Sequence, residues 1–223
     1  MSIIESPLTL SLWVSVLASV SALLLGLALA WLFARHNWRG KWLFEGLVAL
    51  PLVLPPTVLG YYLLLVFGRR GLGSLIEQIS GIAIAFNWPG AVIAAGVSAL
   101  PLVVQTVKPA LLSTAQEIED AARVDGCNEW SVFWLVTFPL IRAAVVGGWL
   151  LAFLRALGEF GATMMIAGNI PGRTQTLSMA VYDAVLSGNF ELAGQLVLLL
   201  SVITFALLFV ALLLSERQRN LHG

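Results

Sequence analysis

Long apolar stretches without a single charged residue constrain this sequence more than any other feature. The stretches 8–34, 46–68, 78–107 and 192–215 contain no Asp, Glu, Lys or Arg. A helix needs about 20 mainly apolar residues to cross a hydrocarbon core of about 30 Å. Charged residues make up 11% of the chain, whereas soluble domains have about 25%. The sequence therefore predicts an all-α integral membrane protein.

We predict five membrane-spanning helices, with one membrane domain over residues 9–214. The fourth span is apolar except for Arg142, Arg155 and Glu159. A sixth span from 174–188 is an open alternative, although this stretch is short and carries Asp183. The five predicted spans are 9–34, 46–68, 89–109, 140–166 and 192–214.

Basic residues at the ends of the spans predict the orientation of the chain. Cytoplasmic ends carry an excess of Lys and Arg, so the side with more of them is expected to be cytoplasmic. The N-terminus is then outside and the C-terminus in the cytoplasm. The first 34 residues lack the basic start of a cleaved signal peptide, so we expect the first span to be retained. The richer side receives Arg35, Arg39, Lys41, Lys108, Arg123, Arg142, Arg217 and Arg219, and the other side receives Arg69, Arg70 and Arg173.

Small residues recur at a spacing of four along the first span, at Ala18, Ala22, Gly26, Ala30 and Ala34. Such a stripe allows the backbones of two membrane helices to approach closely. It indicates either a contact between two copies of the chain or packing against another span of the same chain.

A polar insert of about thirty residues separates the third and fourth spans. A capping box formed by Thr114 and Glu117 predicts a helix that begins near Ala115. Gly126 fits the end of that helix, and Asn128 fits the cap of a second short helix. An interfacial helix on lipid headgroups is disfavoured because such helices are basic, and this insert is acidic. We therefore expect two short helices on the cytoplasmic side that dock a protein partner.

The insert also resembles the EAA loop of bacterial ABC importer permeases. That pattern reads Glu-Ala-Ala, three residues, Gly, nine residues and Ile-x-Leu-Pro. The spacing matches throughout, and the departures at Asp120, Val136 and Phe138 keep the charge or the apolar character. The resemblance implies a coupling loop over about 112–138 that transmits the closure of the ATPase. Its implied coupling residues are Glu119, Asp120, Ala121, Ala122, Asp125 and Gly126.

Two further stretches are similar to molybdate permeases. They are 51–71, with its prolines and Gly68-Arg69-Arg70-Gly71, and 157–174, with Gly158-Glu159-Phe160-Gly161. The second element is shared with sulfate and related oxyanion permeases. The resemblance implies a type I ABC importer permease for molybdate, with tungstate or sulfate as alternatives. A transporter or channel that works without an ATPase remains an alternative of a different class, and a membrane enzyme a weaker one.

The same stretches carry our candidates for the translocation path or gate. Pro55 and Pro56, after Pro51, remove backbone donors inside a span and must kink or break it. Arg155 and Glu159 lie four residues apart and are expected to share a helix face. Each feature has a structural alternative, a simple bend or an ion pair that fixes packing. The candidates are Pro55, Pro56, Arg155, Gly158, Glu159, Phe160 and Gly161.

The chain lacks a phosphate-binding loop, because neither Lys41 nor Lys108 follows the required glycines. We expect a non-catalytic subunit without a cofactor or metal of its own, with ATP and magnesium on the partner ATPase. Zero net charge gives no support to nucleic-acid binding. The resemblance implies two ATPase subunits, a second permease copy and a periplasmic oxyanion-binding protein. Residues 174–188 are expected to form an outer interfacial helix that contacts this binding protein or lipid.

Overall fold

The computed structural model describes residues 5–114 and 116–220, and within them it contains helices and no strand. The predicted all-α class is confirmed. The elements in chain order are α1 (Glu5–Arg35), α2 (Lys41–Ala49), the 3-10 helix η1 (Leu50–Leu52), α3 (Pro56–Phe67), α4 (Leu72–Ser80), α5 (Trp88–Ser113), α6 (Gln116–Val124), α7 (Glu129–Val132), the π-helix η2 (Phe133–Thr137), α8 (Phe138–Leu157), α9 (Gly161–Ala167), α10 (Leu177–Leu186) and α11 (Phe190–Asn220).

Four helical segments of the described chain are long and apolar enough to cross a membrane. A bent pair, Lys41–Leu52 with Pro56–Phe67, makes a fifth if it is counted as one span. The predicted number of five therefore depends on how this pair is counted. The four segments are Ser6–Arg35, Trp88–Ser113, Glu129–Leu157 and Phe190–Phe209.

The second predicted span, 46–68, is broken at its prolines, which confirms the predicted kink or break. The two halves of the pair are bent by 114° at the prolines. Pro55 has an extended backbone, with φ −53° and ψ 134°, and Pro56 begins α3. The residue before a proline is pushed out of the helical region, and proline itself donates no hydrogen bond.

The fourth predicted span, 140–166, is wrong in its limits. The continuous helical segment runs over Glu129–Leu157, and a break at 158–160 separates it from α9. A side chain starts the new helix, because Glu159 Oε1 accepts a hydrogen bond from the backbone N–H of Ala162 at 2.9 Å. The alternative sixth span is reduced to the ten residues of α10. Ten helical residues cover about 15 Å, half of what a span needs.

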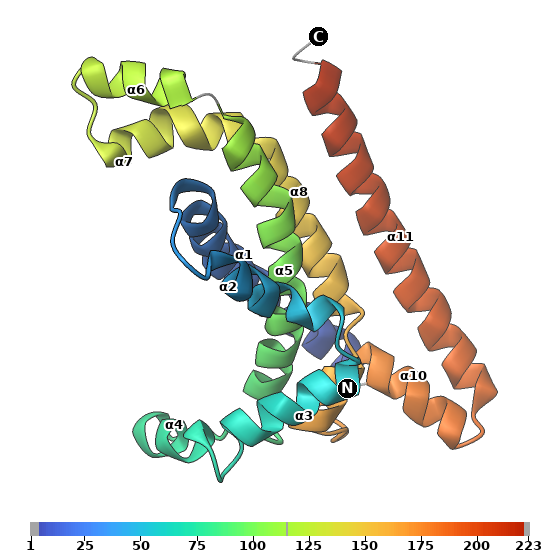
Figure 1. The fold of residues 1–223 in the computed structure, drawn as a ribbon. Coiled ribbons are helices and arrows are strands. Elements are labelled where there is room, and N and C mark those ends of the chain that lie inside the picture. The colour runs from blue at the N-terminus through green and yellow to red at the C-terminus, as the bar shows by residue number, and fades with distance from the viewer. Residues whose placement is uncertain (1–4, 115, 221–223) are drawn as a thin grey trace.

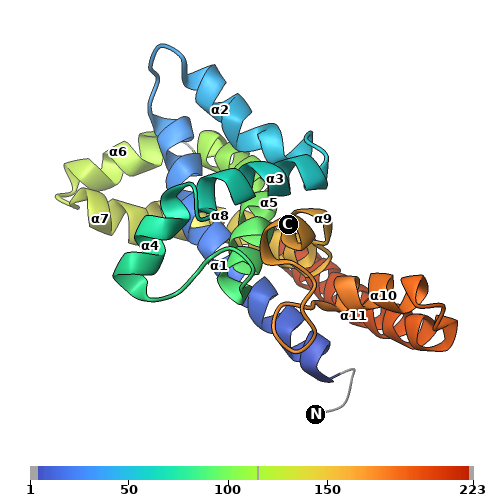
Figure 2. The same cartoon turned by 90° about the horizontal axis from the view of Figure 1, so that it is seen from below.

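The core is built from α1, α5 and α8, which pack on one another along their lengths (Figures 1 and 2). Ala18, Ala22 and Ala30 of the small-residue stripe are buried. A Cβ atom on Gly26 would lie 2.7 Å from two carbons of Val103, so only glycine permits this approach of α1 to α5. The stripe therefore packs within one chain, which confirms the intramolecular interpretation.

The remaining helices surround this core at its two ends. The α6–α7 pair projects from one end, where α5 finishes and α8 begins, while α3, α4 and α10 lie at the other (Figure 1). Helix α11 leans away from the bundle (Figure 1), and only 11% of the most apolar 18-residue stretch within Phe190–Phe209 is buried inside the chain. An apolar helix that buries so little within its own chain leaves a face for lipid or another subunit.

Candidate functional site

Two short helices, α6 and α7, form the first part of the site at the end of the core. They are joined at Gly126, whose φ of +90° lies in the left-handed region that favours glycine. Asn128 caps α7, since its Oδ1 accepts a hydrogen bond from the backbone N–H of Ser131 at 2.8 Å. Both features confirm predictions. The proposed start of the first helix at Ala115 lies outside the described residues, and the Thr114 hydroxyl donates to the carbonyl of Ala110 at 3.0 Å.

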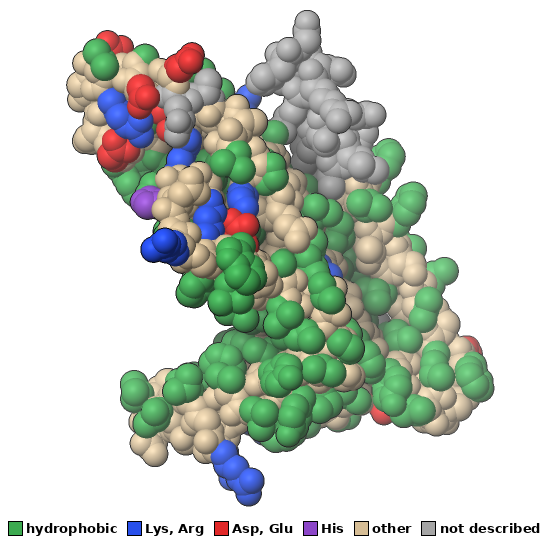
Figure 3. All heavy atoms as spheres, viewed as in Figure 1, with side chains coloured by type: hydrophobic (Ala, Val, Ile, Leu, Met, Phe, Trp, Pro, Cys, Tyr) green, Lys and Arg blue, Asp and Glu red, His purple; other side chains and the backbone are tan. Residues whose placement is uncertain are grey.

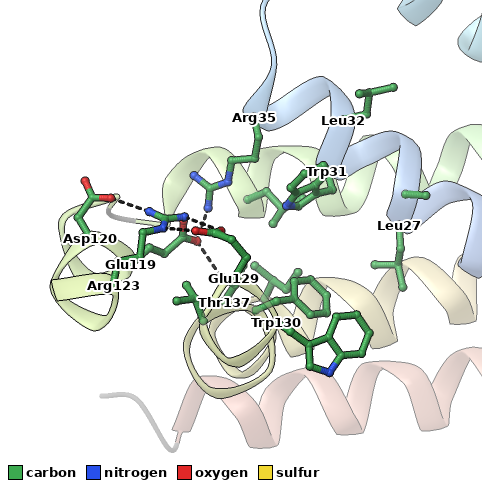
Figure 4. Close-up of a pocket in the computed structure, with 15 residues that line it drawn as sticks. Leu27, Trp31, Leu32, Arg35, Glu119, Asp120, Arg123, Glu129, Trp130 and Thr137 are labelled. Carbon is green, nitrogen blue, oxygen red and sulfur yellow. Dashed lines mark hydrogen bonds and ion pairs between the residues drawn. The ribbon is translucent and has the colours of Figure 1, made fainter. Parts of the chain in front are cut away.

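Glu119 ties this loop to the membrane helices. Its side chain is buried, forms an ion pair with Arg35 at the end of α1 and accepts a hydrogen bond from the Thr137 hydroxyl at 2.8 Å (Figure 4). Arg123 approaches its other oxygen at 3.8 Å. Thr137 ends the π-helix that leads into α8. One carboxylate therefore connects α6 to two core helices.

Arg123 holds the two short helices together on the outer side of the loop. Its guanidinium donates to Glu129 at 2.7 and 3.1 Å and to Asp120 at 2.6 Å (Figure 4). The hydrogen bonds to Glu129, and then those to Asp120, raise the pKa of Arg123. The arginine stays charged at every physiological pH. Its short hydrogen bonds to Asp120 on α6 and Glu129 on α7 fix the relative position of the two helices.

The predicted coupling residues do not all face the same way. Asp120, Ala121, Asp125 and Gly126 are exposed, and Ala122 is half-buried. Glu119 points inward as described above. The exposed members form the tip of the loop, whereas Glu119 belongs to its attachment.

Arg35 and Thr137 are functional candidates that the sequence alone does not single out. In the sequence, Arg35 is only a basic residue at a span end, and Thr137 only a position within the EAA-like pattern. No local signal marked these residues, because Glu119 lies on a mainly polar helix and its partners are far from it in the chain.

An open pocket of about 820 Å³ lies between the loop and the end of α1 (Figure 4). One wall is apolar and aromatic, and the other holds the ion pairs of the loop. The lining includes Leu27, Trp31, Arg35, Glu119, Arg123, Glu129, Trp130 and Phe133. Charged side chains also gather over this end of the molecule in the space-filling view, whereas hydrophobic ones cover most of the face below it (Figure 3).

The path candidates come together where α3 meets α9. A Cβ atom on Gly161 would lie 2.8 Å from Cβ of Pro56, and one on Gly60 would lie 2.7 Å from the backbone of Ala162. Glycine at both positions allows the two helices to touch. Pro55 and Pro56 are themselves exposed on the surface of the chain.

Arg155 and Glu159 form the predicted ion pair, with Nη1 and Oε2 separated by 2.5 Å. They do not share a helix, because Arg155 is in the last turn of α8 and Glu159 lies in the break after it. Glu159 is buried, while the Arg155 side chain is 31% exposed. The carboxylate also caps α9, so the pair secures the break between the two helices.

The two remaining path candidates flank this ion pair. Gly158 is exposed, and the ring of Phe160 lies 5.2 Å from that of Tyr182 in α10. All seven path candidates therefore lie at the α8–α9 break or at the start of α3. The described residues contain no group of three or more His, Cys, Asp or Glu that could hold a metal ion.

The sequence of this chain is similar to those of known transport proteins. Residues 22–220 match the family described as the binding-protein-dependent transport system inner membrane component. The molybdenum transport system permease protein ModB of Escherichia coli K12 is 43% identical over 208 residues, which cover 93% of this chain and 90% of that protein. The sulfate transport system permease protein CysW of Synechococcus elongatus is 36% identical, with 98% and 78% covered.

A solved structure shares the fold at low sequence identity. It is that of a bacterial alginate ABC transporter in complex with an alginate pentasaccharide-bound periplasmic protein. The matching chain superposes with a TM-score of 0.76 at 15% identity, over 97% of this chain and 80% of that one.

Proposed function

Because the chain belongs to the family of binding-protein-dependent transport system inner membrane components, we propose that it imports molybdate as the permease subunit of an ABC transporter. The observation that carries the substrate is the similarity to the molybdenum permease of Escherichia coli over nearly the whole length of both chains. The chain is a multi-pass inner-membrane protein and is not itself an enzyme. ATP is hydrolysed on a separate subunit, which holds the nucleotide and magnesium.

The substrate has two close alternatives. The similarity to a sulfate permease is weaker but also covers the chain, so sulfate is the second candidate. Tungstate has nearly the same size and charge as molybdate, and the same machinery serves both. A transporter that works without an ATPase would have no use for a docking loop of this length, since a simple connector takes only a few residues.

Energy enters the permease through the α6–α7 loop. Its exposed tip, with Asp120, Ala121 and Gly126, docks into the ATPase on the cytoplasmic side. When the ATPase closes, the loop moves as one body, because Arg123 bridges its helices. Glu119 then passes the displacement to α1 through Arg35 and to α8 through Thr137. A buried ion pair suits this task because separating its partners is costly.

Substrate passes between two copies of the permease related by a two-fold axis. The exposed prolines at the start of α3 and the α8–α9 break line the path, and Arg155 attracts the anion. Helix α9 and α3, which touch through Gly60 and Gly161, rock together as the path opens to one side and then the other. The complex contains two ATPase subunits and a periplasmic binding protein, with the N-terminus outside and the C-terminus in the cytoplasm.

ATP hydrolysis in proteoliposomes tests this function. The permease is purified with its co-purifying partners, and binding protein loaded with molybdate, tungstate or sulfate is added. We expect stimulation by the molybdate-loaded protein and loss of that stimulation in Gly126→Pro. Gly147→Ala in α8 is the control, because a Cβ atom there meets nothing within 4 Å.

The outcomes separate the alternatives. Stimulation by the sulfate-loaded protein alone would keep the transporter class and replace the substrate. Transport that continues without ATP or a co-purified ATPase would overturn the proposal.

A further inference from the structure

A second pocket, of about 560 Å³, lies at the end of the molecule opposite the α6–α7 loop. The end of α3, the helix α4, the segment 83–86 and Arg173 line it. Three arginines, Arg69, Arg70 and Arg173, face a single acid there, Glu77. The lining therefore carries two more positive than negative charges, a balance that fits an anionic ligand.

These arginines are available to a ligand. No ion pair to Arg69, Arg70 or Arg173 is found among the side chains that the structure describes, and all three are exposed. Arg35 and Arg123, at the other end of the molecule, both have acidic partners. The proposed transport function assigns no role to this pocket.

The rest of the pocket wall is carbon. Leu64, Phe67, Ile84 and Phe86 line it alongside the arginines. A small, fully hydrated anion would leave such a wall facing water, because anion sites for free oxyanions are built from many hydrogen-bond donors. An amphiphilic anion would cover the arginines and the carbon wall together.

This end of the molecule also exposes apolar side chains outside the pocket, on the face of α4 opposite to Gly73 and Glu77, which line it. Helix α4 projects from the molecule beyond α3 (Figures 1 and 2), and Leu72, Leu75 and Ile79 on it are 54%, 55% and 88% exposed. Trp88, 43% exposed, stands at the start of α5 at the same end. Tryptophan at the end of a span marks the level of the lipid headgroups.

We propose that this pocket binds an anionic phospholipid. The phosphate lies between Arg69, Arg70 and Arg173, and the acyl chains lie along the apolar wall formed by Leu64, Phe67, Ile84 and Phe86. Arg69 and Arg70 follow the end of α3 after Gly68, so their charges stand at the membrane surface while their stems reach over apolar neighbours. The assignment rests on the charge and the apolar wall together, and it holds whichever ion the permease transports.

Native mass spectrometry of the purified permease complex tests this site. The complex is delipidated and then titrated with phosphatidylglycerol or with phosphatidylcholine of the same chain length. We expect a preference for phosphatidylglycerol that falls by about fivefold for each arginine removed, and that is lost in the triple variant Arg69→Gln, Arg70→Gln, Arg173→Gln. The matched control is Arg39→Gln with Arg142→Gln, two exposed arginines that form no ion pair within the described part of the chain.

Three readouts keep the proposal falsifiable. Replacing the same three arginines by lysine should retain most of the preference for phosphatidylglycerol, because the positive charge remains. Retained binding in this lysine variant would also show that the pocket tolerates substitution at these positions. Equal preference in the wild-type and glutamine complexes would overturn the proposal. Displacement of the bound lipid by millimolar molybdate or inorganic phosphate would also overturn it, since the pocket would then be a site for free oxyanions.

Discussion

At the scale of single residues, two carboxylates at opposite ends of the α8 segment hold the candidate site together. Glu119 joins the loop to α1 and η2, and Glu159 joins the end of α8 to the start of α9. Both are buried and both have an arginine partner. A buried carboxylate that keeps its charge needs such a partner, so each position constrains a second residue elsewhere in the chain.

The buried pair at the loop predicts a stability cost and a loss of coupling. Removing one partner, as in Arg35→Ala, should destabilise the permease by roughly 3 kcal/mol because an unpaired charge remains buried. Stimulated ATP hydrolysis should fall while basal hydrolysis stays. Thermal unfolding and ATPase assays on the purified complex measure both effects. The control is Arg39→Ala, which removes an exposed arginine. A coupled, fully stable Arg35→Ala protein would contradict the role of this pair.

Arg155, the partly exposed partner of the second pair, predicts an effect on substrate binding. Loss of a charged contact of about 1.4 kcal/mol corresponds to roughly tenfold weaker binding, so Arg155→Gln should raise the half-saturating concentration for uptake by about that factor. Uptake of labelled molybdate at several concentrations measures this. Normal uptake at low concentration, with reduced thermal stability, would assign Arg155 to packing alone.

At the scale of elements, glycine decides where helices meet. Gly26 lets α1 approach α5, and Gly60 and Gly161 let α3 approach α9. Two membrane helices pack by close backbone contact rather than by expulsion of water, so the absence of a side chain at these points stabilises the contact. The α1–α5 contact lies in the core, and the α3–α9 contact lies at the proposed path.

Adding one methyl group at the contact between α3 and α9 should weaken the packing of these two helices. In Gly161→Ala the new Cβ atom would meet Cβ of Pro56 at 2.8 Å, so α3 and α9 must separate. We expect a lower Tm by an overpacking cost of about 1–3 kcal/mol and slower transport. In Gly147→Ala the methyl group meets nothing, and the gain in helix propensity should stabilise the protein by about 0.5–1 kcal/mol. Equal Tm values for the two variants would refute the close contact.

Gly126, the glycine with a left-handed backbone in the α6–α7 loop, predicts graded losses of stability and of stimulated ATPase activity on substitution. Gly126 has φ +90°, and a Cβ atom added to it would meet no neighbour within 4 Å, so strain and not crowding opposes substitution. Gly126→Ala should cost about 1–2 kcal/mol, and Gly126→Asn less, because asparagine tolerates this region. Stimulated ATPase activity should follow the same order, glycine above asparagine above alanine. An alanine variant as active as the wild type would show that the turn does not set the position of the loop.

At the scale of the whole molecule, the chain leaves much apolar surface uncovered. Most of the segment Phe190–Phe209 of α11 is exposed, and so are Tyr61, Tyr62 and Leu65 on α3. Lipid covers part of this surface. The proposed path residues at the start of α3, Pro55 and Pro56, are exposed as well, which a path enclosed within one chain would not allow.

We therefore expect two permease copies in the working complex. Native mass spectrometry of the complex should show two permease chains and two ATPase chains, and a Tyr61→Cys variant should form a disulfide between permease copies under oxidation. The background variant is Cys127→Ser, because Cys127 is the chain's one native cysteine. A complex with a single permease chain would contradict the shared path.

The class of fold, the loop with its glycine turn and Asn128 cap, and the pairing of Arg155 with Glu159 could all be predicted from the sequence. These follow from local chemistry, because apolar length, turn conformation and capping depend on residues close together in the chain. The partners of Glu119 and the contact of Gly161 with Pro56 emerged from the folded chain alone. They depend on residues far apart in the sequence, such as Arg35 and Glu119, and only the packing of α1, α5 and α8 brings such residues within reach of one another.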